Sequence, residues 1–374
     1  MTTMAPAVPH PGSELPVVTL VMDPHDDAFH THMALAAHRP AAGRITLHPG
    51  PGTTSERALA HDLLAALGRP PLLPGRFPGG RQSAWEAATA WMAALPVTRL
   101  TVLRAHRLTA RRAERLLQLR AVTGTHLTMV CHRPHLPAAL HQALQTVDHV
   151  VITDSAAAHR HHDDGSPAPA DEAAGAGRRS GRWITLPALD RLVSYDSPTP
   201  CRALCTPPPI VWRHRPQPPP LTSRTAGEVA RRLAGATAHP RLAAALASAL
   251  FTGASLQQLA TARPEDYDDA AATLALHDRA RYTDGCAAYP VPPWARVFLR
   301  AAACFARLVT GSDQALLAAL GDRTHLLRLA EEARLRPPQP GAGRRAGRVE
   351  WDWREQQEAK RYDAMAGRGE SWRD

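Results

Sequence analysis

The stretch that decides how the second half of this chain folds runs from His239 to Ala303 and reads HPRLAAALASALFTGASLQQLATARPEDYDDAAATLALHDRARYTDGCAAYPVPPWARVFLRAAA. It opens with leucines that share one face of a helix, Leu242, Leu246 and Leu250. Thr252-Gly253 follows, and a glycine directly after a helical pattern is typical of a helix end. We therefore expect a helix here, and then a second, short helix that begins at Leu256 and ends before Pro264.

The rest of this stretch predicts a hairpin and a third helix. Thr273 to His277 and Ala287 to Val291 have the composition of short strands, and the residues between them are polar and include a glycine. Pro292-Pro293 is tolerated in the first turn of a helix, and apolar residues at helical spacing continue from there to Phe305. We expect a mainly α-helical C-terminal domain with a small β-hairpin.

This order of elements resembles the front half of the catalytic domain of the tyrosine recombinases, or phage integrases. The resemblance depends on the Thr-Gly turn, on RPEDYD at 263–268 and on VPPW at 291–294. Members of that family cleave DNA with a tyrosine, and arginines and a His-x-x-Arg group neutralise the phosphate. The family's first arginine should follow the Thr-Gly turn, where this chain has Ser255, and a serine cannot supply a bidentate cation. The resemblance implies a recombinase-type fold without its first catalytic residue.

One alternative keeps the catalytic activity of that family. His325-Leu326-Leu327-Arg328 matches His-x-x-Arg, and Tyr362 follows at a distance that the family tolerates. Arg328, His325 and Tyr362 are therefore the catalytic candidates of an active site-specific recombinase. Against this alternative, residues 336–347 are rich in proline and glycine, and no helix crosses such a segment. HLLRLAEEARL also has the pattern of an ordinary amphipathic helix.

Composition limits the class of partner. The chain has 374 residues, enough for two domains with linkers, and 44 basic against 34 acidic residues give a net charge of +10. Such an excess points to an acidic partner, nucleic acid first. Five scattered cysteines argue for reduced thiols rather than a disulfide framework. No apolar stretch reaches membrane-spanning length, so we expect a cytoplasmic protein that does not contact a membrane.

The N-terminal part alternates between strand and helix patterns. Val17 to Met22 is a nearly continuous apolar run, as in a strand that is buried on both faces. Further strands are expected at 44–47, 100–103, 127–131 and 149–152, and helices at 28–37, 56–67, 83–95, 110–122 and 137–144. This alternation predicts an α/β domain with a parallel sheet and helices on both faces, over residues 17–153.

Residues 100–130, LTVLRAHRLTARRAERLLQLRAVTGTHLTMV, resemble the region around the acidic strand end of AAA-type P-loop ATPases. In that family an Asp-Glu pair holds magnesium, whereas this chain has Leu103 and Arg104 at the two positions. The loop after the first strand also lacks the glycines and the lysine of a P-loop. The resemblance implies an ATPase-like domain that has lost its nucleotide machinery, and we expect no cofactor.

The loop after the first strand contains side chains that can bind a metal ion. Residues 23–32 read DPHDDAFHTH, and parallel sheets bind ligands at the carboxyl ends of their strands. The order faintly resembles the His-Pro-Asp-Asp loop of zinc-dependent N-acetyl-sugar deacetylases, in which an Asp and a His hold zinc. A metal-dependent hydrolase centred on His25 and Asp27 is therefore a second alternative. The competing interpretation is a polar loop in which Asp26 or Asp27 caps the next helix.

The remaining segments connect the domains or extend beyond them. Residues 1–16 are a proline-rich leader that we expect to be disordered, and 154–221 a proline-rich linker with a short ordered segment, a candidate strand, at Trp183 to Tyr195. The integrase-like domain spans 222–336 and begins with an amphipathic helix, and 337–374 form a charged tail. Linker and tail are the candidate regions for self-association or for a protein partner.

Together these features predict a non-catalytic DNA-binding protein related to tyrosine recombinases, from a mobile element, a plasmid or a phage-derived locus. Arginine contacts to phosphates would dominate its affinity. A scaffold without a nucleic-acid role is the expectation if the basic residues are spread evenly. The candidate DNA-binding residues are Arg231, Arg232, Arg241, Arg263, Arg279, Arg281 and Arg296.

Overall fold

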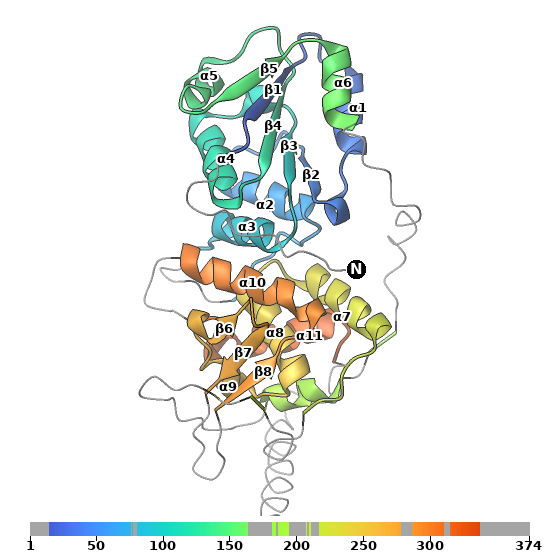
Figure 1. Cartoon of the computed structure of the whole chain (residues 1–374), viewed down its shortest axis with the longest axis vertical. Helices are drawn as coiled ribbons and strands as arrows, with labels where there is room; N and C mark the ends of the chain where they lie inside the picture. The colour runs from blue at the N-terminus through green and yellow to red at the C-terminus, as the bar shows by residue number, and fades with distance from the viewer. Residues whose placement is uncertain are drawn as a thin grey trace, which may run out of the picture.

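A computed structural model of the chain has two stacked regions, an α/β region and a mainly helical region that follows it in sequence (Figure 1). The structure describes residues 15–75, 77, 81–163, 182–184, 186–193, 207, 209–210, 217–277, 286–309 and 315–336. The expected leader and charged tail lie almost entirely outside these ranges. None of the described helices combines the length and the apolarity that a membrane span requires.

Five strands form the N-terminal sheet in the order β2-β3-β4-β1-β5. They are β1 (Val18–Met22), β2 (Arg44–Leu47), β3 (Arg99–Val102), β4 (His126–Cys131) and β5 (His149–Ile152). Every pairing is parallel, so the carboxyl ends of all five strands lie at one edge of the sheet. The predicted parallel α/β architecture is confirmed, and each expected strand is present to within one residue at either end.

Helices cover both faces of this sheet because successive side chains of a strand point in opposite directions. Leu20 belongs to the main hydrophobic core, whereas Val21 belongs to a smaller core with Ala34 and Ala158. The smaller core lies beneath α1 (Ala28–Ala36) and α6 (Ser155–Asp163), which run side by side. The opposite face carries α2 (Glu56–Ala66), α3 (Ala84–Ala94), α4 (Ala110–Thr123) and α5 (Ala138–Leu144).

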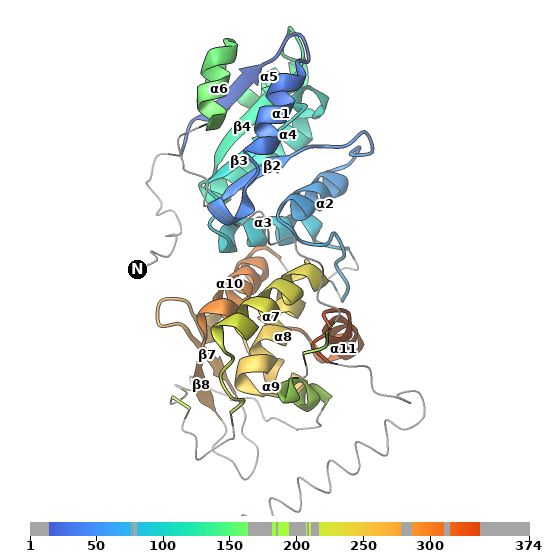
Figure 2. The ribbon, with the colours of Figure 1, turned by 90° about the vertical axis from the view of Figure 1, so that its right-hand side faces the viewer.

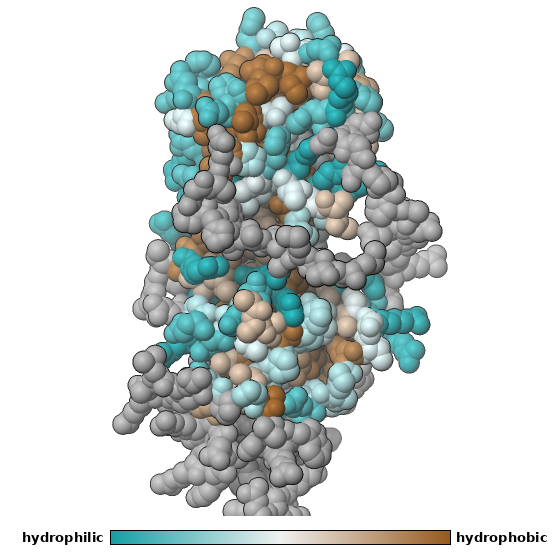
Figure 3. Space-filling view, viewed as in Figure 1, coloured by the Kyte–Doolittle hydropathy of each residue, from teal (hydrophilic) through white to brown (hydrophobic). Residues whose placement is uncertain are grey.

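Strand β5 forms one edge of the sheet and is poorly covered. Val150 is 54% and Val151 is 49% exposed, and apolar surface is visible at that end of the molecule (Figure 3). An exposed, apolar edge strand offers unpaired backbone groups to another chain.

The C-terminal region is built around α8 (Pro240–Thr252), whose residues are nearly all buried. Around it lie α7 (Ser223–Ala236), α9 (Leu256–Leu259), α10 (Pro293–Leu308) and α11 (Arg323–Glu332) (Figure 2). A small antiparallel sheet contains β6 (Tyr267–Asp268), β7 (Thr273–Leu276) and β8 (Ala287–Pro290). The mainly helical character and the β-hairpin predicted for this region are both confirmed.

The turn after α8 follows the sequence prediction. Gly253 has a φ of 65°, in the left-handed region, and its N–H bonds to the carbonyl of Ala249. A side chain at this position would be strained, and a Cβ would lie 3.1 Å from the ring of Pro218. The left-handed backbone of Gly253 therefore explains why α8 ends at the Thr-Gly pair, without any catalytic role for this turn.

Trp91 of α3 joins the two regions. Its buried ring meets Phe298 of α10 edge-on, with 6.0 Å between the centroids, and its indole N–H donates to the carbonyl of Ala238 at 2.7 Å. The guanidinium of Arg69 lies 3.8 Å from the centre of the same ring. One hydrophobic core consequently runs from α3 into α8 and α10.

Two segments differ from the expected linker at 154–221. Residues Ser155–Asp163 form α6, because Ala158 packs into the smaller core beside α1. The candidate strand at Trp183 to Tyr195 instead contains a 3-10 helix, η5 (Pro187–Val193). Its buried Leu189 and Leu192 are three residues apart, which places them on one face of a 3-10 helix. Most of the remaining linker lies outside the described residues.

His239, at the start of α8, makes the stability of this fold pH-dependent. It is buried between Phe77 and Phe305, with ring centroids 4.9 and 5.5 Å away, and burial lowers its pKa to about 3. Between pH 6.5 and pH 3 this imidazole is protonated in the unfolded chain but stays neutral in the native state. The free energy of unfolding therefore falls as the pH drops from 6.5 towards 3. Between pH 7 and pH 5, the wild type should lose about 2 kcal/mol more than His239→Phe in urea titrations. Equal losses would show that this histidine is not buried in its neutral form.

Candidate functional site

The candidate site lies at the carboxyl edge of the parallel sheet. Pairing of β1 with β4 places Met22 opposite Cys131, so the residues that follow, Asp23 and His132, are neighbours although 109 positions separate them. The N–H of Asp23 donates to the carbonyl of Cys131 at 2.9 Å, which extends the pairing one residue beyond β1. Arg104 follows β3 at the same edge. The first polar residues after β1, β3 and β4 therefore lie near one another at this edge.

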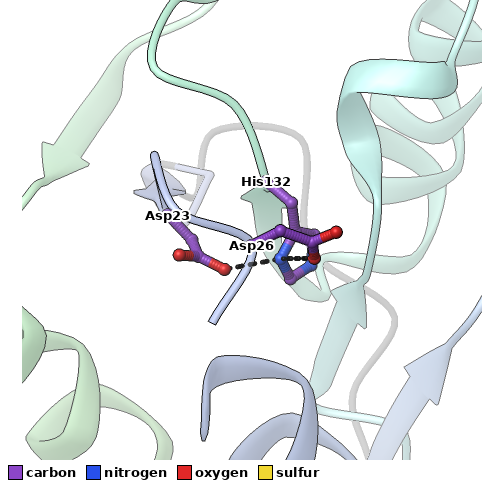
Figure 4. Close-up of side chains that lie close together, drawn as sticks. All are labelled: Asp23, Asp26 and His132. Carbon is purple, nitrogen blue, oxygen red and sulfur yellow. Dashed lines mark hydrogen bonds and ion pairs between the residues drawn. The ribbon is translucent and has the colours of Figure 1, made fainter. Parts of the chain in front are cut away.

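Asp23, Asp26 and His132 form a compact cluster (Figure 4). The imidazole Nδ1 of His132 lies 2.7 Å from Oδ2 of Asp23 and 3.3 Å from Oδ1 of Asp26. Asp23 is 1% and His132 is 5% exposed, so their contact is sheltered from water, whereas the side chain of Asp26 is 53% exposed. A buried pair of this kind depends on both partners, because either one alone would be a poorly solvated polar group.

The backbone is strained where two side chains of this site meet. Asp26 has a φ of 50° and Arg104 a φ of 54°, both in the left-handed region that residues other than glycine seldom adopt. The two side chains form an ion pair, with Nη1 of Arg104 3.4 Å from Oδ2 of Asp26. Such strain costs roughly 1–3 kcal/mol per residue and tends to occur at functional sites.

Arginines and histidines surround the cluster. The ring of His106 stands 6.1 Å from that of His132, edge to face. Burial lowers the pKa of His106, and the neighbouring His132, Arg107, Arg133 and Arg104 lower it further. Arg107 and Arg133 are exposed, so the edge presents cations to solvent around an acidic centre.

Two ring nitrogens at this site are buried without a partner among the described residues. They are Nε2 of His132 and Nδ1 of His106. A buried polar atom without a hydrogen bond destabilises the fold by about 1–3 kcal/mol, unless water or a ligand satisfies it. With Nδ1 of His132 bonded to Asp23, Nε2 is the ring nitrogen that is left to bond a water or a ligand atom.

The two residues that the sequence singled out for a metal, His25 and Asp27, do not join the cluster. Asp27 caps α1, because its Oδ1 accepts the N–H of Phe29 at 2.9 Å, and its own N–H donates to Asp23. His25 is exposed. The loop singled out in the sequence contributes Asp23 and Asp26 to the cluster, whereas Asp27 caps α1 as the competing interpretation expected. The signal that was available is position, since Asp23 and His132 directly follow two buried strands.

The described candidate DNA-binding arginines of the C-terminal region differ in their partners and burial. Arg231 and Arg232 of α7 both pair with Glu228. Arg241 is 5% exposed, with its guanidinium 5.7 Å from the centre of the Phe305 ring.

The other candidates also differ in exposure. Arg263 is exposed and lies 3.9 Å from Glu265, and Arg296 is half-buried. Arg279 and Arg281 lie outside the described residues.

The structure describes three of the four positions that the resemblance aligns with recombinase catalysis, Ser255, His325 and Arg328. Ser255 is buried and caps α9, where its side chain accepts the N–H of Gln258, so this serine has a structural role. His325 and Arg328 lie on α11, and Nε of the exposed Arg328 donates to Glu332 at 2.7 Å. Tyr362 lies outside the described residues. The amphipathic pattern of this segment is confirmed as a helix.

The cluster permits two kinds of chemistry. Two carboxylates and one imidazole are the ligand types that Zn²⁺ accepts, and three protein ligands leave a coordination position for water. The arginines around them suit a phosphate or another anion.

Neither a scan against protein-family models nor searches among curated proteins and solved structures found a significant match to this chain.

Proposed function

We propose that this protein binds DNA without cleaving it, and that arginines at the carboxyl edge of the N-terminal sheet make the main phosphate contacts. The observation that carries this proposal is that Arg107 and Arg133, which follow β3 and β4 at the carboxyl edge of the sheet, are both exposed to solvent. Guanidinium groups pair with phosphate oxygens in a bidentate geometry. Arg104 is already paired with Asp26, so the exposed Arg107 and Arg133 are the arginines available for such contacts.

Comparison with the C-terminal arginines favours this edge. A cation that is already bonded to a carboxylate gains less from a phosphate, and this applies to Arg231 and Arg232. Arg107 and Arg133, in contrast, form no ion pair with an acidic residue of the described chain. The sequence led us to expect DNA contacts in the C-terminal region, whereas we now propose that the N-terminal region makes them.

The charge of the whole chain supports the same proposal. A net charge of +10 attracts a polyanion at a distance, whichever surface makes the contact. A relationship to tyrosine recombinases and an origin in a mobile element, a plasmid or a phage-derived locus remain parts of this proposal. The structural use of Ser255 as a helix cap agrees with binding in the absence of strand cleavage.

The DNA proposal predicts a change in salt dependence. In fluorescence anisotropy with a labelled duplex of about 30 base pairs, log K should fall linearly with log salt. The double variant Arg107→Gln/Arg133→Gln should reduce the magnitude of that slope by about 2, because each lost phosphate contact contributes about 1.

A second double variant, Arg39→Gln/Arg160→Gln, is the matched control for charge. Arg39 precedes β2, at the opposite edge of the sheet, and Arg160 lies in the second half of α6. This control should keep the wild-type slope. Equal slopes in the two double variants, or no binding at low salt, would contradict the proposal.

The Asp23–Asp26–His132 cluster favours a second candidate function, a metal-dependent hydrolase. One ligand atom from each of the three residues lies within 4.8 Å of the others, a spacing that a single ion can bridge. A bound Zn²⁺ would supply an activated water. In that case Asp23 and Asp26 would bind the ion together with Nδ1 of a neutral His132. The competing role of Arg104 is to neutralise Asp26 in the absence of an ion.

This second candidate predicts one Zn²⁺ per chain in equilibrium dialysis at pH 7.5. His132→Ala and Asp26→Asn should each weaken binding by at least about tenfold, and binding should weaken as the pH falls because the imidazole must be deprotonated. His25→Ala is the matched control in the same loop and should bind as the wild type does. Unchanged binding in both cluster variants would rule out this site, and loss of binding in His25→Ala would restore the ligand set expected from sequence.

A further inference from the structure

A cavity of about 550 Å³ lies between the two regions, on the side of the junction where α3 ends. The N-terminal region contributes Leu95, Val97 and Val122, from the end of α3, the approach to β3 and the end of α4. The C-terminal region contributes the face of α10 that runs from Arg300 to Leu308, together with Tyr267 and Asp269. Its volume falls within the roughly 300–1,000 Å³ of small-molecule sites, which often lie at domain interfaces.

The cavity has apolar walls and one organised polar corner. Oδ1 of Asp269 accepts both the hydroxyl of Tyr267 at 2.7 Å and Nε of Arg300 at 2.6 Å. Burial and the bond to Asp269 raise the pKa of Tyr267, so the phenol stays neutral. Burial opposes ionisation of Asp269, but the bonds from Arg300 and Tyr267 outweigh it and lower the pKa of this carboxyl.

The charges of this corner leave one cation in excess. Asp269 neutralises Arg300, while Arg307, two helical turns further along the same face of α10, is exposed at the rim. Arg307 forms no ion pair with any acidic residue in the part of the chain that the structure describes. Between the two arginines, Ala303 and Cys304 line the wall with small groups.

We propose that this cavity is a binding site for an amphipathic organic monoanion, a molecule with one carboxylate or sulfonate on a compact apolar body. The apolar body would lie against Leu95, Val97 and Val122, and the anionic group would pair with Arg307. The Tyr267–Asp269–Arg300 corner fixes the far wall and is already satisfied internally. This site does not depend on DNA or metal binding.

The test uses the full-length protein and 1-anilinonaphthalene-8-sulfonate, which combines an aromatic body with one negative charge. Fluorescence titration should show one site per chain. Ala303→Trp and Val122→Trp fill the cavity from opposite walls, and each should weaken binding by at least tenfold. Val122 is 46% exposed, so its replacement should not disturb folding, and far-ultraviolet circular dichroism verifies this for both variants.

The charge is tested separately. Arg307→Gln should weaken binding of the sulfonate probe roughly tenfold, the range of one charged hydrogen bond. It should leave unchanged the binding of N-phenyl-1-naphthylamine, an uncharged molecule of the same shape. Arg328→Gln, an exposed arginine of α11, is the control and should bind both probes as the wild type does. Undiminished sulfonate binding in the two folded tryptophan variants, or in Arg307→Gln, would overturn the proposal.

Discussion

Parallel pairing of β1 with β4 is the constraint on which the candidate site depends. It sets Met22 opposite Cys131, and the next residue of each strand is then placed at the same edge of the sheet. Asp23 and His132 are buried there in contact with each other, and β3, paired on the far side of β4, brings Arg104 to the same edge. A slip of one residue in this register would turn Asp23 towards the opposite face of the sheet and separate the pair.

The same edge combines features that cost stability. Two residues other than glycine have left-handed backbones, and two histidine nitrogens are buried without a partner among the described residues. A polar cluster in a buried setting is tolerated when its members satisfy one another or a ligand does so. The Trp91 junction between the two regions lies elsewhere, where the indole contacts Phe298, Arg69 and the carbonyl of Ala238.

Local patterns in the sequence predicted the elements well because strand and helix periodicity are local properties. The five strands, the end of α8 at Thr252-Gly253 and the hairpin all follow from such patterns. Two features depended on packing that no local pattern contains, namely α6, held against α1 through Ala158, and the 3-10 helix around Leu189.

The site was harder to predict because its residues are brought together by strand order, which local patterns do not reveal. The loop at 23–32 was identified, but the partner of Asp23 is 109 residues away and only the strand order brings the two together. Asp27 was a plausible ligand by residue type, whereas the start of α1 uses its carboxylate as a cap. Arg231 and Arg232 of α7 are candidate phosphate contacts by residue type, but both pair with Glu228, which lies one turn earlier in the same helix.

Hydrogen–deuterium exchange with and without a duplex at low salt tests the central claim most directly, because it locates the surface that DNA covers. If the carboxyl edge binds the phosphates, amides in 103–109 and 132–136 should exchange more slowly in the complex, while those in 223–236 should not change. Protection confined to the C-terminal region, or none at either surface, would contradict the account.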